Sequence, residues 1–444
     1  MDRHRTIESY LSSFETFEKN LNGEASAEIH SVRKAAIRRF SELGFPTTRQ
    51  EEWKYTDISP LLEVAFALLP PDHTVPENLH EVERAFGGRF KHRLVCVNGS
   101  FVERLSDVSS LPKGTHAGSL AKALKDQDPV VRLHLARYAR FEENSFTALN
   151  TAFLKDGIFV YLPDDAVLDA PLHLVFVSTR SDSEFVTHPR NLIIAGKNSH
   201  AVVVETFVNL TDNRYFTNAV TEISVGENAF LEHEKVQREG VHAFHIAALH
   251  IHMERNSNFV SNNINFGGGL VRNTITAVLD GQGAEATLNG LYVGKDEQVI
   301  DNHTTIDHAQ PHCSSHELYK GILDGRSKGV FNGKIIVRKD AQKTDAKQTN
   351  KNLLLSDGAT IDTKPQLEIY ANDVKCTHGA TTGQLDDESL FYMRSRGIPE
   401  GTARVMLIDA FASDVLDRVK TESVRQELQG LLQARLNGIR REGR

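Results

Sequence analysis

A polar turn recurs at nearly constant spacing through the middle of the sequence. The copies are GKNSHAVVVE from Gly196, GENAFLEHEK from Gly226, ERNSNFVSNN from Glu254 and GQGAEATLNG from Gly281, so they recur every 27 to 30 residues. Each copy is a polar turn, a small residue and then alternating apolar positions. Such a period is typical of a solenoid, in which each coil buries its apolar face on the next. Because the turns recur in register, a parallel β-helix is favoured over a β-sandwich or jelly roll.

The repeat lies inside a longer β-rich region, predicted over 166–385. There, short runs rich in Val, Ile, Thr and Phe alternate with Gly and Asn turns. Residues 1–165 are predicted to be mostly helical, because apolar residues follow three- and four-residue steps. Residues 386–444 are predicted to form a C-terminal helical domain. The expected fold is therefore mainly β, with a parallel β-helix core between two helical domains.

The C-terminal domain is expected to contain a short helix around DESLFYMRSRG and one long amphipathic helix over SDVLDRVKTESVRQELQGLLQARLNGI. The apolar stripe of the long helix consists of Val415, Leu416, Val419, Leu428, Leu431, Leu432 and Leu436. This stripe is expected to dock on the chain's own β domain, or else on another protein.

Charge and cysteine content narrow the function classes. The net charge of −8 argues against a nucleic-acid-binding protein. Three widely spaced cysteines form neither a disulfide framework nor a CxxC motif, which favours a reducing compartment. The first twenty residues lack the apolar run of a signal peptide, and no apolar stretch approaches the roughly 20 residues of a membrane span. A cytoplasmic protein without a membrane segment is expected.

Enzyme motifs are absent from the sequence: it has no Walker A loop, GxSxG elbow or HExxH, and spacing selects no carboxylate pair. A non-enzymatic role is therefore expected. Histidines cluster between His233 and His316 and are predicted to be polar rungs on the outside of the solenoid, with metal binding as the alternative. Trp53 is expected to anchor packing. The polar stretch VRKDAQKTDAKQTNKN is expected to form a solvated face.

The segment KCTHGAT carries the clearest metal-ligand candidates. In an extended strand, Cys376 and His378 point to the same face. A thiolate and an imidazole on one face could hold a soft metal. They could equally be an ordinary buried thiol beside a surface histidine.

Several longer blocks resemble the SufB/SufD family of iron–sulfur cluster assembly proteins. They are DNHTTIDHAQPHCSSHELYKGILDGRSKGVFNGKIIV, KQTNKNLLLSDGATIDTKPQLEIYANDVKCTHGATTGQLDDESLFYMRSRGIP, RQEEWKYTDISPLL and FTALNTAFLKDGIFVYLP. Within the family, the chain is similar to the SufD branch. SufB proteins carry a scaffold cysteine before the strand that matches LLLSDGA, where this chain has Asn350, Lys351 and Asn352. They also tend to have a cysteine where this chain has Met393.

The resemblance implies a right-handed parallel β-helix and a heterodimer with SufB, paired near the C-terminal ends of the two β-helices. It implies that His378 contributes to a nascent cluster at the SufB interface, with Cys376 as the weaker candidate. The chain alone is expected to hold no cofactor tightly, and iron or an Fe–S cluster would be bound transiently. The C-terminal helical domain is expected to bind the ATPase SufC. The candidate SufC-binding residues are Phe391, Tyr392, Arg396, Val405, Leu407, Phe411 and Val415.

Two other functions stay open. A SufB-like scaffold acting as a homodimer is disfavoured by the missing thiol near Lys351. A β-helix carbohydrate-active enzyme would need a secretion signal and an acidic pair. In isolation, the chain could also pair with itself through the edge that SufB would occupy.

Overall fold

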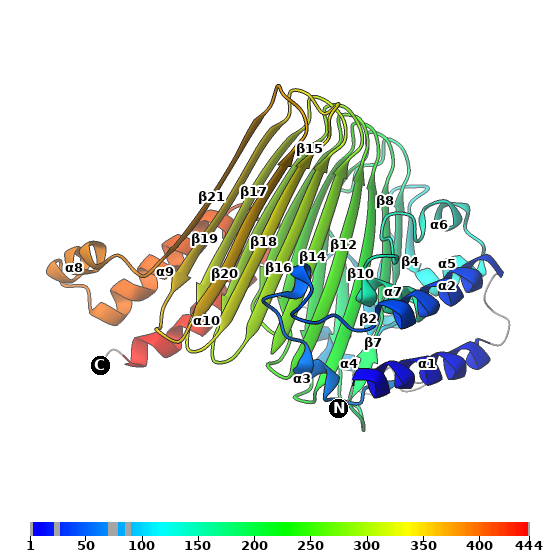
Figure 1. Ribbon diagram of the computed structural model, residues 1–444, viewed down its shortest axis with the longest axis horizontal. Coiled ribbons are helices and arrows are strands. Elements are labelled where there is room, and N and C mark those ends of the chain that lie inside the picture. Colours follow the sequence, from blue (N-terminus) through cyan, green and yellow to red (C-terminus); the bar gives the residue numbers. More distant parts are fainter. Residues whose placement is uncertain (1–2, 22–26, 70–78, 85–89, 443–444) are drawn as a thin grey trace.

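The computed structural model describes residues 3–21, 27–69, 79–84 and 90–442. Strands wound into two facing sheets form a long solenoid, with helices at both ends of the chain (Figure 1). The prediction of a mainly β, parallel β-helix fold is confirmed. The helices are α1 (Arg3–Asn20), α2 (Ala27–Leu43), α3 (Ser59–Leu62), α4 (Leu79–Arg84), α5 (Leu120–Lys125), α6 (Pro129–His134), α7 (Ser145–Ala152), α8 (Asp387–Ser395), α9 (Glu400–Leu416) and α10 (Glu422–Glu442), with short 3₁₀ turns at Glu51–Trp53 and Glu103–Leu105.

The strands divide between two sheets. The first sheet runs β20-β18-β16-β14-β12-β10-β8-β5-β4, with β1 and β7 beside it, and the second runs β21-β19-β17-β15-β13-β11-β9-β6-β2-β3. The strands are β1 (Ala67–Leu68), β2 (His92–Val97), β3 (Ser100–Phe101), β4 (His116–Ser119), β5 (Ile158–Leu162), β6 (Leu172–Ser178), β7 (Phe185–Thr187), β8 (Arg190–Ala195), β9 (His200–Asn209), β10 (Tyr215–Val225), β11 (Phe230–Arg238), β12 (Ala243–Met253), β13 (Asn258–Asn265), β14 (Leu270–Leu279), β15 (Glu285–Gly294), β16 (Val299–His308), β17 (Ser314–Leu323), β18 (Lys328–Val337), β19 (Asp345–Leu354), β20 (Thr360–Ile369) and β21 (Lys375–Gly383). Consecutive strands from β8 onward alternate between the sheets, so each pair of strands makes one coil.

The sequence repeat marks one turn of each coil. Its third residue has a left-handed backbone at Asn198 (φ 55), Asn228 (φ 57), Asn256 (φ 54) and Gly283 (φ 74). Asparagine and glycine tolerate this conformation better than other residues. The asparagines also stack: Asn228 donates to Asn198 at 3.1 Å and Asn256 donates to Asn228 at 3.2 Å. The backbone demand of the turn therefore produces the period seen in the sequence.

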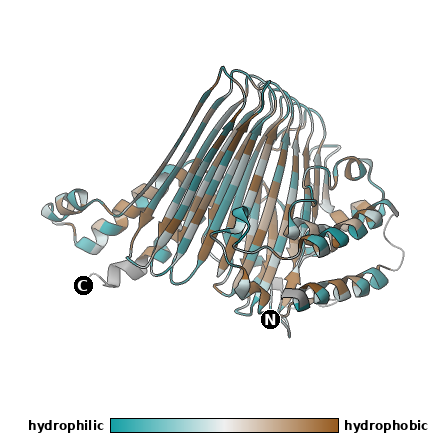
Figure 2. Ribbon diagram, viewed as in Figure 1, coloured by the Kyte–Doolittle hydropathy of each residue, from teal (hydrophilic) through white to brown (hydrophobic). Residues whose placement is uncertain are grey.

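Alternation along each strand separates an inner face from an outer face. Figure 2 shows hydrophobic and hydrophilic residues interspersed along the strands. Inward residues such as Leu231, Phe259, Leu288 and Phe331 are buried in one continuous apolar core. Polar side chains also point inward at several levels. The inner face is thus a mixture of apolar packing and buried polar contacts.

The N-terminal helices pack an aromatic cluster against the outer face of the first sheet. Phe40, Phe45 and Phe146 meet Phe216 of β10 in this cluster. Trp53 is buried, and the Arg272 guanidinium lies 3.8 Å from the centre of its ring. The prediction that Trp53 anchors packing is confirmed. Strands β2, β4 and β5 precede residue 166 and join the same two sheets.

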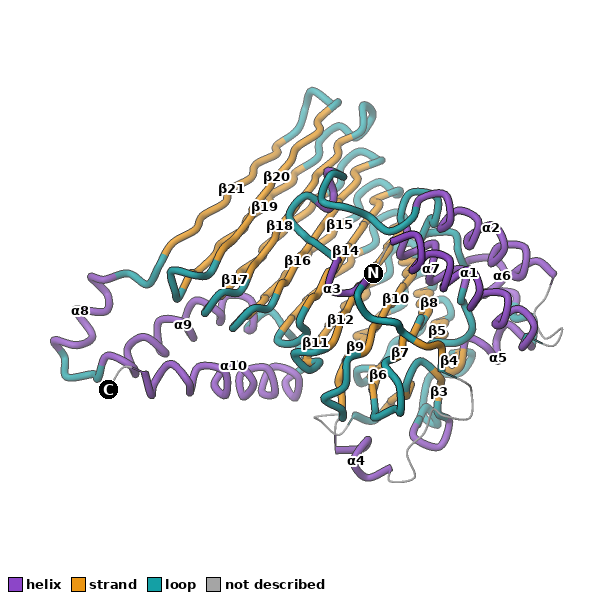
Figure 3. Tube along the Cα trace, turned by 60° about the horizontal axis from the view of Figure 1, so that its bottom comes forward, coloured by secondary structure: helices purple, strands orange, loops and turns teal. Residues whose placement is uncertain are grey.

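The C-terminal helices cover the outer face of the second sheet, and α8 extends beyond the last strands (Figure 3). Buried stripe residues such as Val415, Leu428 and Leu432 pack with Leu291 and Ile322 of the sheet. The stripe therefore docks on the chain's own solenoid, the first of the two expected outcomes.

The prediction of one long C-terminal helix is wrong. Helix α9 ends at Leu416 and α10 begins at Glu422. Glu234 of β11 explains the break, because its Oε1 accepts the backbone N–H groups of Lys420 (3.0 Å) and Thr421 (3.1 Å). The carboxylate caps the new helix start, where backbone donors have no intrahelical partner.

Candidate functional site at the open end of the solenoid

The solenoid ends in a coil whose inner face is open. Strands β20 and β21 are the last strands of the two sheets. In the preceding strand β19, the inward residues Ala346 and Gln348 are buried, at 0% and 2% exposure. In β20, most residues are only partly buried, and in β21 nearly all are exposed. Within the described chain, no further strand continues either sheet at this end.

Cys376 and His378 lie on the inner face of β21. Their register partners in β19 are Ala346 and Gln348, which both point into the solenoid. The two side chains therefore share one face of the strand, as the sequence predicts. Cys376 is half-buried against apolar neighbours including Ala341, and burial raises the pKa of its thiol. His378 is exposed. The imidazole is thus the more accessible of the two ligand candidates.

A polar column runs inward from His378. Each step moves to the neighbouring strand, from His378 to Gln348 and then to Glu317 of β17. Gln348 Nε2 donates to Glu317 Oε2 at 2.7 Å, and both side chains are buried. Burial raises the pKa of Glu317 to about 7. Sequence reasoning missed both residues, although their spacing from His378 follows the coil period and could have revealed them.

Three histidines overturn the prediction that the cluster lies outside the solenoid. His233, His245 and His308 are buried inside it, with exposures of 0%. His245 lies 2.7 Å from Glu239, and His233 lies 3.3 Å from Glu205. Desolvation lowers the pKa of His245 and, to about 4, that of His308. His233 was misplaced because its carboxylate partner, Glu205, lies one coil earlier in the chain. His245 and His308 were misplaced because alternation along a strand does not by itself say which of its two faces is buried.

The polar stretch predicted as a solvated face is solvated on one side only. Its lysines at 339, 343, 347 and 351 are exposed. The intervening Gln348, Asn350 and Asn352 are buried inside the solenoid, where Asn352 donates to Asn350 at 2.6 Å. The prediction is wrong for these inward residues, since strand alternation places every second side chain in the core.

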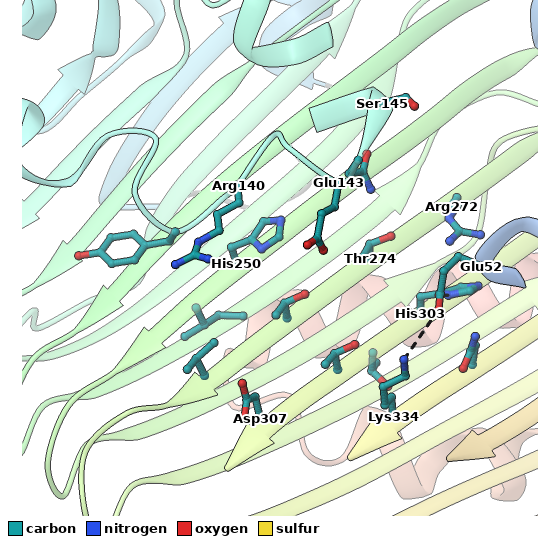
Figure 4. Close-up of a pocket in the computed structure, with 18 of the residues that line it drawn as sticks. Glu52, Arg140, Glu143, Ser145, His250, Arg272, Thr274, His303, Asp307 and Lys334 are labelled. Atoms are coloured by element: carbon teal, nitrogen blue, oxygen red, sulfur yellow. Dashed lines mark hydrogen bonds and ion pairs between the residues drawn. The ribbon is translucent and has the colours of Figure 1, made fainter. Parts of the chain in front are cut away.

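A polar cleft of about 930 Å³ lies on the outer face of the first sheet, between the Glu51–Trp53 turn and residues 137–145 (Figure 4). The charged side chains that line the cleft are largely paired with one another. Glu52 Oε2 lies 3.2 Å from His303 Nδ1, and this contact is the main cause that lowers the pKa of Glu52 to about 2. Arg338 forms an ion pair with Asp307 at 2.6 Å. Five Arg and Lys side chains face five Asp and Glu side chains, so no net charge selects a ligand.

The candidate SufC-binding residues lie in two places: on the exposed surface of α8 and α9, and in the seam where α9 packs on the solenoid. Phe391 and Tyr392 of α8 are 72% and 59% exposed, and with Leu407 they line a groove between α8 and α9. Arg396 is exposed and lies over the Tyr392 ring at 5.1 Å. The remaining candidates face the solenoid: Val405 and Val415 are buried in the seam, and Phe411 packs beside them.

A buried lysine that the sequence analysis did not single out fastens this seam. Lys320 of β17 donates to the Phe411 backbone oxygen at 2.8 Å and forms an ion pair with Asp414. Its ammonium lies 4.3 Å from the centre of the Phe411 ring. The lysine therefore links α9 directly to the strand that also carries Glu317.

The described residues contain neither a cluster of metal ligands nor a helix able to cross a membrane. No three His, Cys, Asp or Glu side chains within 3–21, 27–69, 79–84 and 90–442 gather as a metal site. Over the same ranges, no helix combines the length and apolar character needed to cross a bilayer.

Comparison with known proteins identifies the family. Residues 4–174 match the model of the SufBD protein N-terminal region, and residues 176–411 match that of the SUF system FeS cluster assembly SufBD core domain. An iron–sulfur cluster assembly SufBD family protein of Synechocystis is 33% identical over 429 residues, covering 94% of this chain and 93% of that protein.

Two proteins named SufD are also similar. Iron–sulfur cluster assembly protein SufD of Escherichia coli is 32% identical over 404 residues, covering 90% of this chain and 92% of that protein. SufD of Bacillus subtilis is 26% identical over 325 residues, covering 71% and 72%. With both halves of the chain matched and full-length relatives above 30% identity, this chain belongs to the SufBD family of iron–sulfur cluster assembly proteins.

Proposed function

We propose that this chain is a SufD-type, non-enzymatic subunit of a cytoplasmic SUF complex. In this role it pairs with SufB through the open end of its solenoid and binds the ATPase SufC through α8 and α9. The similarity to two proteins named SufD supports the branch. The open terminal coil is the single observation that carries the pairing.

Unpaired strand edges explain why the open end suits a partner. A free edge presents backbone donors and acceptors that invite another strand. Lys375 N–H donates to the backbone oxygen of Thr344, directly before β19, and successive backbone groups in a strand point to opposite sides. The N–H of Ala380, five residues on, therefore faces the free edge. A partner strand can bond there without disturbing the bond between β21 and β19.

The exposed aromatics of α8 suit a second partner. Phe391 and Tyr392 present a large apolar surface on a helix that lies away from the sheets (Figure 1). Aromatic side chains are enriched at the centres of protein interfaces. The two partner surfaces are thus distinct: a strand edge for SufB and an aromatic groove for SufC.

The group bound at the interface with SufB would be iron or a nascent Fe–S cluster. His378 faces the open end and offers a ring nitrogen as a ligand, and a SufB thiolate would supply the softer donor. Cys376 is the weaker candidate, because its half-buried thiol has a raised pKa and is mostly protonated near neutral pH.

Copurification of co-expressed SufB and SufC tests the two surfaces separately. Ala380→Pro removes the outward donor and should abolish SufB recovery, while Ala380→Val keeps the donor and should retain it. Phe391→Ala with Tyr392→Ala should lose SufC and keep SufB, with Leu133→Ala as a control at another exposed apolar residue. Equal SufB recovery with the proline and valine variants would contradict pairing through this edge.

The ligand role has its own test. His378→Ala should leave SufB and SufC recovery unchanged, because the imidazole is exposed and the substitution leaves the backbone donors of β21 in place. The yield of reconstituted cluster on the purified complex should fall by at least the roughly tenfold that loss of a contact supporting a ligand already causes. A normal yield from an intact complex would reject the ligand role.

A further inference from the structure

The amide of Gln348 is buried next to His378 with half of its hydrogen-bonding capacity unused. Its Nε2 donates to Glu317, whereas its Oε1 is buried and has no hydrogen-bond partner among the described residues. Leaving a buried carbonyl oxygen unpaired is unfavourable, so such an atom calls for an explanation.

The surroundings fix this amide in place. A Cβ at Gly333 of β18 would lie 2.2 Å from Gln348 Nε2 and 2.8 Å from its Cδ. Only a residue without a side chain leaves room there. The same nitrogen is held by the 2.7 Å bond to Glu317. With Nε2 bonded to Glu317, Oε1 is the free end of the amide.

The rung next to Gln348 holds one ring donor. His378 is the register partner of Gln348, on a strand about 4.8 Å away, and both side chains are on the inner face. A neutral imidazole has one N–H and one lone pair. If the N–H bonds inward to Oε1, the lone pair of the other nitrogen is directed out of the open end. Histidine ligands are commonly oriented in this way by a second hydrogen bond.

We propose that Gln348 is a positioning residue, which accepts the ring N–H of His378 and is held for that task by Glu317 and Gly333. This inference rests on the proposed ligand role of His378. It predicts that His378 has one dominant ring tautomer in the free chain, before any metal or partner binds.

The ring tautomer can be measured in the full-length chain alone. Long-range ¹H–¹⁵N spectra report it, and the His378 signals are those missing from the spectrum of His378→Asn. Gln348→Leu removes the acceptor and should shift the tautomer ratio of His378 about tenfold, the effect of one ordinary hydrogen bond. Thr349→Val, which changes the neighbouring outward residue of the same strand, should leave the ratio unchanged.

Two further variants keep the inference testable if Gln348→Leu perturbs folding. Glu317→Leu releases the amide and should also shift the ratio, whereas Glu317→Gln keeps an acceptor for Nε2 and should preserve it. Gly333→Ala should act like Glu317→Leu by displacing the amide. An unchanged ratio in Gln348→Leu and Glu317→Leu would overturn the inference.

Cluster reconstitution distinguishes a failure of this inference from a failure of the proposed ligand role of His378, on which it rests. In the complex with SufB and SufC, Gln348→Leu should lower the cluster yield about tenfold, the usual lower range for losing such a supporting contact. If His378→Ala gives a normal yield while Gln348→Leu shifts the tautomer, the proposed ligand role fails and the positioning contact stands. If Gln348→Leu changes neither the tautomer ratio nor the cluster yield, while His378→Ala lowers the yield, only the positioning role is rejected.

Discussion

Single side chains inside the solenoid carry ionisable groups far from water, and Glu317 is the clearest case. Burial raises its pKa from 4.5 to about 7, and no charged group acts on it to offset that effect. Since the folded protein binds this proton more tightly than the unfolded chain, the contribution of Glu317 to stability is greatest below pH 4.5. This stabilising contribution is lost as the pH rises from 4.5 through 7. At 1.36 kcal/mol per pKa unit, the loss amounts to about 3 kcal/mol.

Glu317→Gln cannot ionise and should remove this pH dependence. Relative to the unmodified protein, the variant should gain about 3 kcal/mol of unfolding free energy between pH 5 and pH 8. Urea denaturation at the two pH values measures the difference, with the exposed Glu8→Gln as a control. An identical pH response in Glu317→Gln and the unmodified chain would show that this carboxyl is not buried as described.

Among the elements, those set by local patterns were predictable and those set by distant contacts were not. The coils were predictable because each repeat carries its own left-handed residue, such as Asn228. The break between α9 and α10 was not, because Glu234 lies almost 190 residues before it. The face shared by Cys376 and His378 followed from strand alternation. The Gln348–Glu317 contact required the register between coils.

The break also yields a prediction for α10. Glu234→Ala leaves the N–H groups of Lys420 and Thr421 without their acceptor and should destabilise the start of the helix by about 1–2 kcal/mol. Hydrogen exchange should accelerate in α10 while β11 stays protected. Glu234→Gln, which keeps an acceptor oxygen, should behave like the unmodified chain. Slow exchange at the start of α10 in the alanine variant would mean that the cap does not set this boundary.

As a whole molecule, the protein is a stack of coils with unequal ends. The early coils are covered by the N-terminal helices, whereas β20 and β21 each lack one neighbour. In a solenoid, stability comes largely from nearest-neighbour contacts, so the terminal coil has the least support.

Amide exchange in the free chain should therefore be at least about tenfold faster in β20 and β21 than in β14 and β16. Adding SufB should slow exchange in the two terminal strands and leave the central strands unchanged. Ala380→Pro should show the same fast exchange with and without SufB. Uniform protection along all coils would argue against an open end.

The short connection from β21 to α8 has a mechanical consequence. Only Gln384, Leu385 and Asp386 separate Gly383 from the start of α8, a tether that spans about 10 Å at full extension. Once this tether is fully extended, further movement of α8 away from the solenoid pulls directly on the strand that carries His378. A partner that moves α8 can therefore act mechanically on the backbone of the strand that carries the candidate ligand.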